Sequence, residues 1–241
     1  WTASAATAAS ITDWVVQYST NNSTWTTFSD GVSTSTSTTV TGLTNGTLYY
    51  FKVAGINAAT TGTYSSSGSG TPRTVPNAPI ITTLTPGITQ VVVAWSAPAT
   101  GGSAITDYDL EYSSNSGSTW TAWASGTTST ATSVTVTGLT NGTAYVFRVL
   151  AKNLAGSGSY SATSSSSTPR TVPTISGQPV LTNAGSGQLL VTWTAPTSNG
   201  GSAITDYGVE RYQYNNGCGC WQSVVDGVST ATTFTDTGLI N

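Results

Sequence analysis

The sequence contains no histidine, and it is poor in charge and in long apolar runs. Without histidine, the commonest general base, the usual partner of a nucleophilic serine or cysteine and the commonest metal ligand are all missing. Charged residues make up 6% of the chain, against about 25% in typical soluble proteins. They are scattered singly, which argues against a nucleic-acid partner or an anionic membrane surface, because both require clustered Lys and Arg. No apolar run approaches the roughly 20 residues that span a bilayer, so we expect no membrane insertion.

Cysteine is equally scarce, with only Cys218 and Cys220 present. Two cysteines are too few for a disulfide framework, and they provide only half of a structural zinc site. A bridge between positions i and i+2 would be strained in an extended strand but fits a turn that contains Gly219. We therefore expect a local loop disulfide or a free pair, with an intermolecular bridge as a third interpretation.

Threonine, serine and glycine supply the polarity that charge does not, and 10% of the residues are aromatic. Branched and aromatic side chains fit a pleated, half-buried surface, so this mixture favours strands. No Leu/Glu/Lys/Ala pattern of helical period occurs. The sequence therefore predicts an all-β protein with almost no helix.

The chain repeats itself about every hundred residues. A turn followed by an alternating strand occupies 137–152, recurs at 41–52, and starts again at 237–241. A tryptophan followed by a loop and Ile-Thr-Asp also occurs three times: Trp1 with 11–13, Trp95 with 105–107, and Trp193 with 204–206. Repetition at this period indicates tandem domains, and we expect repeats at 1–74, 75–171 and 172–241.

The middle repeat reads as six or seven short strands with Gly/Asn/Ser turns near every tenth residue, including a last strand after Tyr160, which indicates an antiparallel sandwich. In the strand 107–112, Tyr108, Leu110 and Tyr112 share one face. The other face carries the carboxylates of Asp107, Asp109 and Glu111, of which the third repeat keeps Asp206 and Glu210 and the first keeps Asp13. Because the set is not retained between copies, we expect a solvated face, with a calcium or acid/base site as the alternative.

Three groups of residues in this repeat resemble a fibronectin type III domain of the kind common in bacterial and phage surface proteins. They are Trp95, the Tyr108-x-Leu110-x-Tyr112 strand, and the run from Leu139 to Tyr145. The resemblance implies tandem antiparallel immunoglobulin-like β-sandwiches. It also implies core tryptophans at Trp1, Trp95 and Trp193, and a tyrosine corner at Tyr49 and Tyr145, where the hydroxyl bonds to the upstream backbone.

By this resemblance the middle repeat is complete and the outer two are not. The first repeat would lack strand A and the third strands F and G, so we expect an internal window of a longer repeat polymer. The linkers 71–76 and 168–173 are short and bounded by proline, which makes them stiffer than Gly/Ser tethers of the same length.

Aromatic residues on the short strand after the 107–112 hairpin allow two interpretations. They are Trp120 and Trp123 in the second repeat, Trp25 and Phe28 in the first, and Trp221 in the third. Exposed indoles stack on sugar rings, whereas large aromatics more often cap a core. Both interpretations stay open, and Trp123 is the one most suited to a glycan.

Together these observations predict a non-enzymatic segment, without cofactor or metal, that serves as a structural spacer in a longer extracellular or virion fibre. Its partners would be neighbouring repeats and further copies in a filament, at a cell or virion surface. One alternative is an adhesin or carbohydrate-binding module that contacts a surface glycan. A second alternative is the accessory spacer of a secreted polysaccharide-degrading enzyme.

Overall fold

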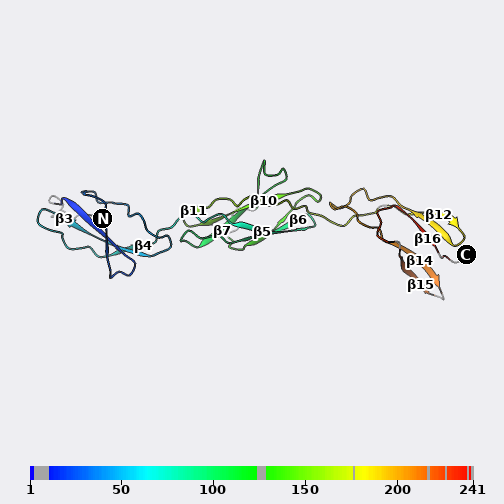
Figure 1. The fold of residues 1–241 in the computed structure, drawn as a ribbon, viewed down its shortest axis with the longest axis horizontal. Coiled ribbons are helices and arrows are strands. Elements are labelled where there is room, and N and C mark those ends of the chain that lie inside the picture. Colours follow the sequence, from blue (N-terminus) through cyan, green and yellow to red (C-terminus); the bar gives the residue numbers. More distant parts are fainter. Residues whose placement is uncertain are drawn as a thin grey trace.

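The computed structural model describes residues 1–2, 11–123, 129–175, 177–215, 218–225, 227–237 and 239. Every strand in this part of the chain pairs antiparallel with its neighbours, and the three repeats follow one another along a rod (Figure 1). The predicted all-β tandem architecture is confirmed. None of the described residues forms a helix long and apolar enough to cross a membrane.

The second repeat is a complete two-layer sandwich. One layer, in the order β5-β6-β9, contains Ile80–Gly87, Gln90–Ser96 and Ser133–Thr137; the other, β11-β10-β7-β8, contains Gly156–Ser157, Val146–Asn153, Ile105–Ser113 and Thr121–Trp123. Alternation in the sequence places the apolar residues of both layers inward, because successive side chains of a strand point to opposite faces. Val91, Val93, Val136, Phe147 and Val149 are fully buried between the layers.

The first repeat has one sheet within its described residues. It consists of β2-β1-β3-β4, formed by Thr26–Phe28, Asp13–Ser19, Tyr49–Ile56 and Gly68–Gly70. Trp1 lies on this sheet with 37% of its surface exposed, so the prediction that it is a core residue is wrong. In the second repeat the equivalent Trp95 belongs to β6 and is enclosed between two sheets, whereas the described residues of the first repeat form no second sheet.

The third repeat has two separate sheets in its described part. The first, β12-β13-β16, contains Val180–Gly185, Gln188–Thr192 and Thr233–Thr237. The second is the hairpin β14-β15, formed by Val209–Asn215 and Cys218–Val224. Trp193 is half-buried beside them, so it is less enclosed than Trp95, of which 6% is exposed.

An edge-to-face aromatic pair nevertheless marks the same place in each repeat. The ring centroids of Trp95 and Tyr108 are 5.3 Å apart at 63°. Those of Trp193 and Tyr207 are 5.4 Å apart at 68°, and those of Trp1 and Trp14 are 5.6 Å apart at 64°. Offset and edge-on arrangements are the favourable ones for aromatic rings. The shared geometry shows that the three tryptophans are structurally equivalent, although they differ in burial.

The segment that follows β11 departs from the predicted last strand. Residues 158–167 run beside β10 without forming a regular ladder. The N–H groups of Ser161 and Ser164 donate to the carbonyls of Val149 and Phe147, at 2.8 and 3.0 Å. In return, the Oγ atoms of these serines accept from the Val149 and Phe147 N–H groups, at 3.2 and 2.9 Å. Three residues of this segment thus span two of β10, and serine hydroxyls replace the carbonyls of a regular partner strand.

The two joints between repeats are closed by the same backbone contacts. At the first joint the Thr74 N–H donates to the carbonyl of Gly101 at 2.8 Å, and the Gly46 N–H to that of Pro72 at 2.9 Å. At the second, the Thr171 N–H donates to Gly200 at 2.7 Å and the Gly142 N–H to Pro169 at 2.9 Å. Each joint therefore combines a linker, the Asn-Gly turn of one repeat and a Gly-Gly loop of the next.

Only glycine fits the second position of each Gly-Gly loop. Gly102 and Gly201 have φ values of +87° and +90°, a region that other residues rarely occupy. A Cβ on either residue would overlap the backbone of the preceding repeat at Gly46 or Gly142. The two backbones thus meet without intervening side chains.

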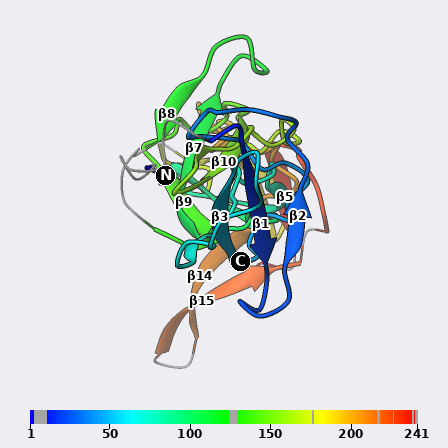
Figure 2. The same cartoon turned by 90° about the vertical axis from the view of Figure 1, so that its left-hand side faces the viewer.

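The repeats are also rotated about the long axis of the rod. Seen end-on in Figure 2, the equivalent hairpins β7–β8 and β14–β15 protrude on opposite sides.

Candidate functional site

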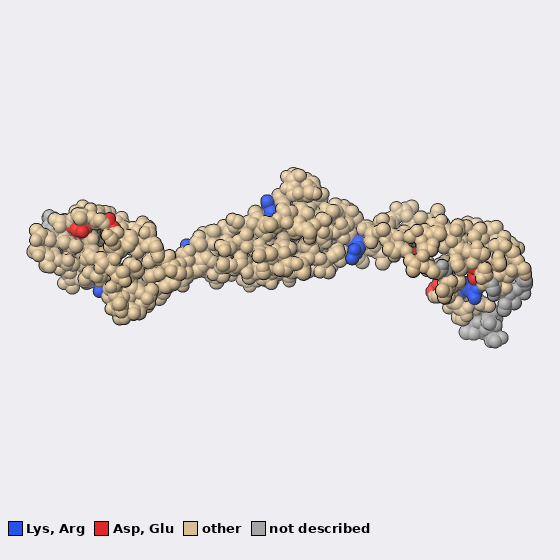
Figure 3. Space-filling model, viewed as in Figure 1, with Lys and Arg blue, Asp and Glu red and all other residues tan. Residues whose placement is uncertain are grey.

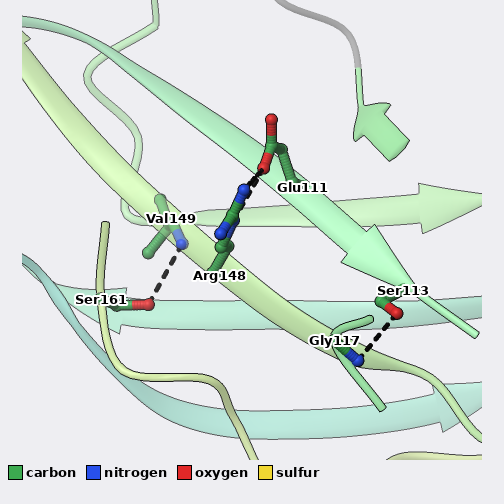
Figure 4. A network of polar contacts seen from close by, with 6 residues as sticks. All are labelled: Glu111, Ser113, Gly117, Arg148, Val149 and Ser161. Atoms are coloured by element: carbon green, nitrogen blue, oxygen red, sulfur yellow. Dashed lines mark hydrogen bonds and ion pairs between the residues drawn. The ribbon is translucent and has the colours of Figure 1, made fainter. Parts of the chain in front are cut away.

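The most elaborate side-chain arrangement on the surface is a stack around Arg148 in the second repeat. Arg148 on β10 lies directly opposite Glu111 on β7, and its Nε and Nη2 atoms are 2.7 and 2.6 Å from the carboxylate Oε2 (Figure 4). The guanidinium carbon is 4.2 Å from the ring centroid of Trp120 and 4.2 Å from that of Tyr160. The cation is therefore held between two aromatic faces and neutralised by one carboxylate.

The first repeat contains the same stack with a lysine. The ammonium of Lys52 on β3 lies 4.1 Å from the centroid of Trp25 and 4.5 Å from that of Tyr64. Gln17, rather than a carboxylate, stands opposite Lys52 on β1. We refer to these two groups, Arg148 with Trp120 and Tyr160, and Lys52 with Trp25 and Tyr64, as the cation stacks. Sequence reasoning missed them, although a Lys or Arg at the same place in both copies of the repeated stretch was the available signal.

The Tyr160 hydroxyl has an altered acidity in this setting. Burial raises its pKa to about 12, and the neighbouring Glu111 carboxylate adds to the effect because ionisation would place two negative charges side by side. The phenol therefore remains a neutral hydrogen-bond donor at physiological pH. Its role in the stack is to cover the second face of Arg148.

The cation stacks bear directly on the predicted glycan surface. One ring face of Trp25 and of Trp120 is occupied by a cation that reaches across the intervening strand, β1 or β7, from β3 or β10. Trp123 and Phe28 are half-buried, and Trp123 packs against the core cluster of the second repeat. Stacking of a sugar on these residues stays a prediction. The contacts just described leave fewer aromatic ring faces free for a sugar than the sequence suggested.

The acidic face of β7 is not the solvated surface that we expected. Asp107 is 6% exposed, and the Lys152 ammonium lies 2.5 Å from Asp109 and 3.9 Å from Asp107. The prediction is wrong because the long basic side chains of β10 lie across the carboxylates and neutralise them. No group of three or more His, Cys, Asp or Glu residues in the described part is placed to hold a metal ion.

Asp107 has a structural role that recurs in every repeat. Its Oδ1 accepts a hydrogen bond from the Ser129 N–H at 3.1 Å. Asp13 accepts in the same way from Ser33 at 2.9 Å, and Asp206 from Ser229 at 3.0 Å. Each Ile-Thr-Asp motif thus ties its own segment to a later loop of the same repeat. The signal in the sequence was that only this acid occurs in all three copies.

The remaining predicted residues are placed as follows. The Tyr145 hydroxyl accepts from the Thr140 N–H at 3.1 Å, and Tyr49 accepts from Thr44 at 3.1 Å, which is the geometry implied for a tyrosine corner. Cys220 is exposed and free, and the side chain of Cys218 lies outside the described residues, so the disulfide stays a prediction. Figure 3 shows Lys, Arg, Asp and Glu as isolated spots on an otherwise uncharged surface.

Comparison with known proteins agrees with this architecture. The family model described as the fibronectin type III domain matches residues 1–71 and 77–167. Exoglucanase B of Cellulomonas fimi is 31% identical over 225 residues, which cover 87% of this chain and 19% of that protein. Endoglucanase B of Cellulomonas fimi is 38% identical, covering 60% of this chain and 13% of that protein.

A human relative, the cell adhesion molecule-related/down-regulated by oncogenes protein, is 33% identical over 60% of this chain and 12% of its own length. The chain therefore spans about a fifth or less of each of these three relatives. Matches to the family model extend over more than half of the chain, in two consecutive regions. With its paired sandwich sheets and repeated tyrosine corners, the chain belongs to the fibronectin type III domain family.

Proposed function

We propose that this chain is a semi-rigid spacer, which holds the parts of a larger extracellular protein at a fixed separation and orientation. The observation that carries the proposal is the repetition of the same backbone contacts at both joints. A flexible tether would need no such contacts, whereas a spacer of defined length needs each repeat to dock on the next in one way.

Three features of the structure stiffen the joints. The linkers contain proline at both ends, backbone hydrogen bonds join the linker to the next repeat, and glycine pairs let the two backbones touch. At the first joint Asn153 adds a side-chain tie, since its Nδ2 donates to the carbonyls of Thr74 and Thr100 at 2.8 and 2.7 Å. Bending the rod at this joint would break several of these bonds at once.

The names of two relatives favour one parent class. Both are glucanases of which this chain covers only a small part, which supports an accessory spacer in a polysaccharide-degrading enzyme over a fibre. Determining the sequence on either side of these 241 residues tests this: a glycoside hydrolase domain would support it, and a filament or tail-fibre neighbourhood would overturn it. The names give no support to a virion, so that placement stays a prediction.

The spacer proposal is tested by disrupting the backbone contacts at the two joints. Replacing Gly102 and Gly201 with valine should leave the folded content unchanged by circular dichroism, because each residue lies in a loop. Small-angle scattering should then show a broader distribution of end-to-end distances, as should pulsed electron paramagnetic resonance between spin labels on repeats 1 and 3. Valine at Gly68 and Gly208, where a Cβ meets nothing within 4 Å, is the matched control. A wild-type chain with an equally broad distribution would contradict the proposal.

An adhesin remains the second candidate because one relative's name includes cell adhesion. It predicts glycan-array binding that is lost in Trp123→Ala without unfolding. Absence of binding on a broad glycan array would exclude the adhesin and would not affect the spacer proposal.

A further inference from the structure

Asn199 and Gly200 form an Asn-Gly pair in the loop that closes the second joint. The sequence contains three other pairs of this kind, at 45–46, 141–142 and 216–217. Because glycine has no Cβ, its main-chain nitrogen is little hindered when it attacks the side-chain amide of a preceding asparagine. In the first joint the same loop position is Thr100, which has no side-chain amide. The two joints therefore differ by one reactive group.

The two reacting groups of this pair are hydrogen-bonded within their own loop. The Gly200 N–H donates to the Ser198 Oγ at 3.2 Å, and the Gly201 N–H donates to the Asn199 Oδ1 at 3.0 Å. The second bond polarises the side-chain carbonyl, and it would stabilise the negative charge that develops on Oδ1 during attack. The first directs the Gly200 proton to a hydroxyl at an exposed position, from which water can accept it. Both bonds therefore favour attack of the Gly200 nitrogen on Asn199.

The corresponding atoms of the pair at 141–142 are held by other elements. The Asn141 Oδ1 accepts from the Thr89 N–H in the β5–β6 turn at 2.8 Å, and the Gly142 N–H donates to the carbonyl of Pro169 in the linker at 2.9 Å. Attack by the Gly142 nitrogen must first break its bond to the linker and turn Asn141 away from the β5–β6 turn. The fold therefore protects Asn141, whereas the partners of Asn199 move with its own loop.

The closed joint leaves no room for a longer main chain at this point. Gly200 is buried, and its carbonyl accepts from the Thr171 N–H at 2.7 Å. A Cβ on Gly200 would overlap the Thr171 carbonyl, and a Cβ on Gly201 would overlap the backbone of Gly142. One extra carbon atom in the main chain directly before Gly200 would displace both glycines. Their contacts with the linker and with the second repeat would then be lost.

We propose that Asn199 is a site of spontaneous deamidation and that its conversion to isoaspartate opens the second joint. The Gly200 nitrogen attacks the Asn199 Cγ, and the new N–Cγ bond closes a five-membered succinimide ring. The Cγ–Nδ2 bond breaks, and the nitrogen leaves as ammonia with the proton that Gly200 has lost. Water then hydrolyses the ring. Opening at the main-chain carbonyl gives isoaspartate, in which the main chain runs through Cγ and gains one carbon atom, whereas opening at Cγ gives aspartate.

The inference rests on the proposed spacer function, because opening a joint has an effect only where the joint is rigid. Cyclisation turns the Gly200 nitrogen towards the Asn199 side chain and draws Gly200 away from Thr171, so the reaction proceeds when the joint opens transiently. The product then prevents the joint from closing again. The first joint has Thr100 at this position and stays closed, so the modification frees the third repeat from a rigid pair formed by the first two.

The chemistry is tested on the full chain in mildly alkaline buffer, with peptide mass spectrometry and enzymatic methylation of isoaspartate. We expect Asn199 to deamidate about tenfold faster than Asn141, the factor expected when hydrogen bonds to other elements must open first. Unfolding the chain in urea should remove most of this difference, because both residues precede glycine. Equal rates in the folded chain, or faster loss of Asn141, would overturn the proposal.

The effect on the joint is tested by pulsed electron paramagnetic resonance on the same samples. Incubation should broaden the distance distribution between spin labels on repeats 2 and 3 but not between labels on repeats 1 and 2. Asn199→Thr, which copies the first joint, is the matched control and should keep a narrow distribution throughout.

Four results would contradict the opening of the joint. Isoaspartate at position 199 with an unchanged distribution would overturn it, as would equal broadening in Asn199→Thr. Freshly prepared Asn199→Asp adds the charge without the extra carbon atom, so a broad distribution in this variant would overturn the role of that atom. A wild-type distribution that is broad before incubation would overturn the spacer proposal and the opening of the joint together, whereas the two deamidation rates test the chemistry separately.

Discussion

Arg148 on β10 and Trp120, just before β8, meet across β7, with the guanidinium carbon 4.2 Å from the indole centroid. The cation also pairs with Glu111 and is covered on its other face by Tyr160. A residue that looks like an isolated surface charge in the sequence therefore joins three elements: β7, β10 and the segment after β11.

Replacing Arg148 with methionine should lower the free energy of unfolding of the second repeat by about 1–3 kcal/mol, because a cation–π contact and a charged hydrogen bond are lost together. Methionine keeps the apolar stem, so the loss reports the charge. Urea unfolding followed by tryptophan fluorescence measures it. Arg73→Met is the control, since Arg73 is exposed in a linker. Equal effects of the two changes would contradict a stabilising stack.

Much of the fold could be predicted because it depends on local patterns. Alternation placed the strand 107–112 within two residues of the observed ends of β7, and the family resemblance implied both tyrosine corners. The cation stacks could not be found this way. Trp120, Arg148 and Tyr160 are far apart in sequence, and only the pairing of β7 with β10 brings them together.

Two of the errors in prediction have a common physical cause. Asp107 and Glu111 were expected in water because carboxylates usually face it, but register places Arg148 and Lys152 across them. The strand expected after Tyr160 failed because serine hydroxyls there bind the main chain of β10. In each case a long-range partner decided the outcome, and the local sequence does not identify that partner.

The hydrogen bond from the Ser129 N–H to Asp107 should contribute strongly to the stability of the second repeat. Asp107→Ala removes the acceptor of the Ser129 N–H and leaves Lys152 with one carboxylate fewer, so we expect a loss of about 1–3 kcal/mol. Asp107→Asn keeps an acceptor and should cost less. Urea unfolding of both variants checks the order. Asp30→Ala, at an exposed position, is the control, and a loss there as large as in Asp107→Ala would argue against the tether.

Stability should fall at alkaline pH through Tyr160. Its pKa is about 12 in the folded chain, against an ordinary value of 10.0. Below pH 10 the Tyr160 phenol keeps its proton in both the folded and the unfolded chain, so its contribution to stability is complete. Between pH 10 and 12 the phenol ionises in the unfolded chain but not in the folded one, and this stability is lost. Ultraviolet difference spectra of wild type and Tyr160→Phe isolate this phenol. Glu111→Gln should move its transition to lower pH, and a Tyr160 transition at pH 10 in the wild type would contradict the assignment.

The serine segment beside β10 should depend on its hydroxyls rather than on side-chain size. Ser161→Ala leaves the buried Val149 N–H without its acceptor, which should cost about 1–3 kcal/mol, and Ser164→Ala does the same to Phe147. Hydrogen exchange at these two amides should accelerate in the matching variant. Ser161→Thr keeps the hydroxyl and should retain most of the protection, and Ser166→Ala, on an exposed residue of the same segment, should change neither amide. If alanine at Ser161 leaves the exchange of Val149 unchanged, the edge of β10 is closed by packing alone, and the hydroxyl bonds add nothing to it.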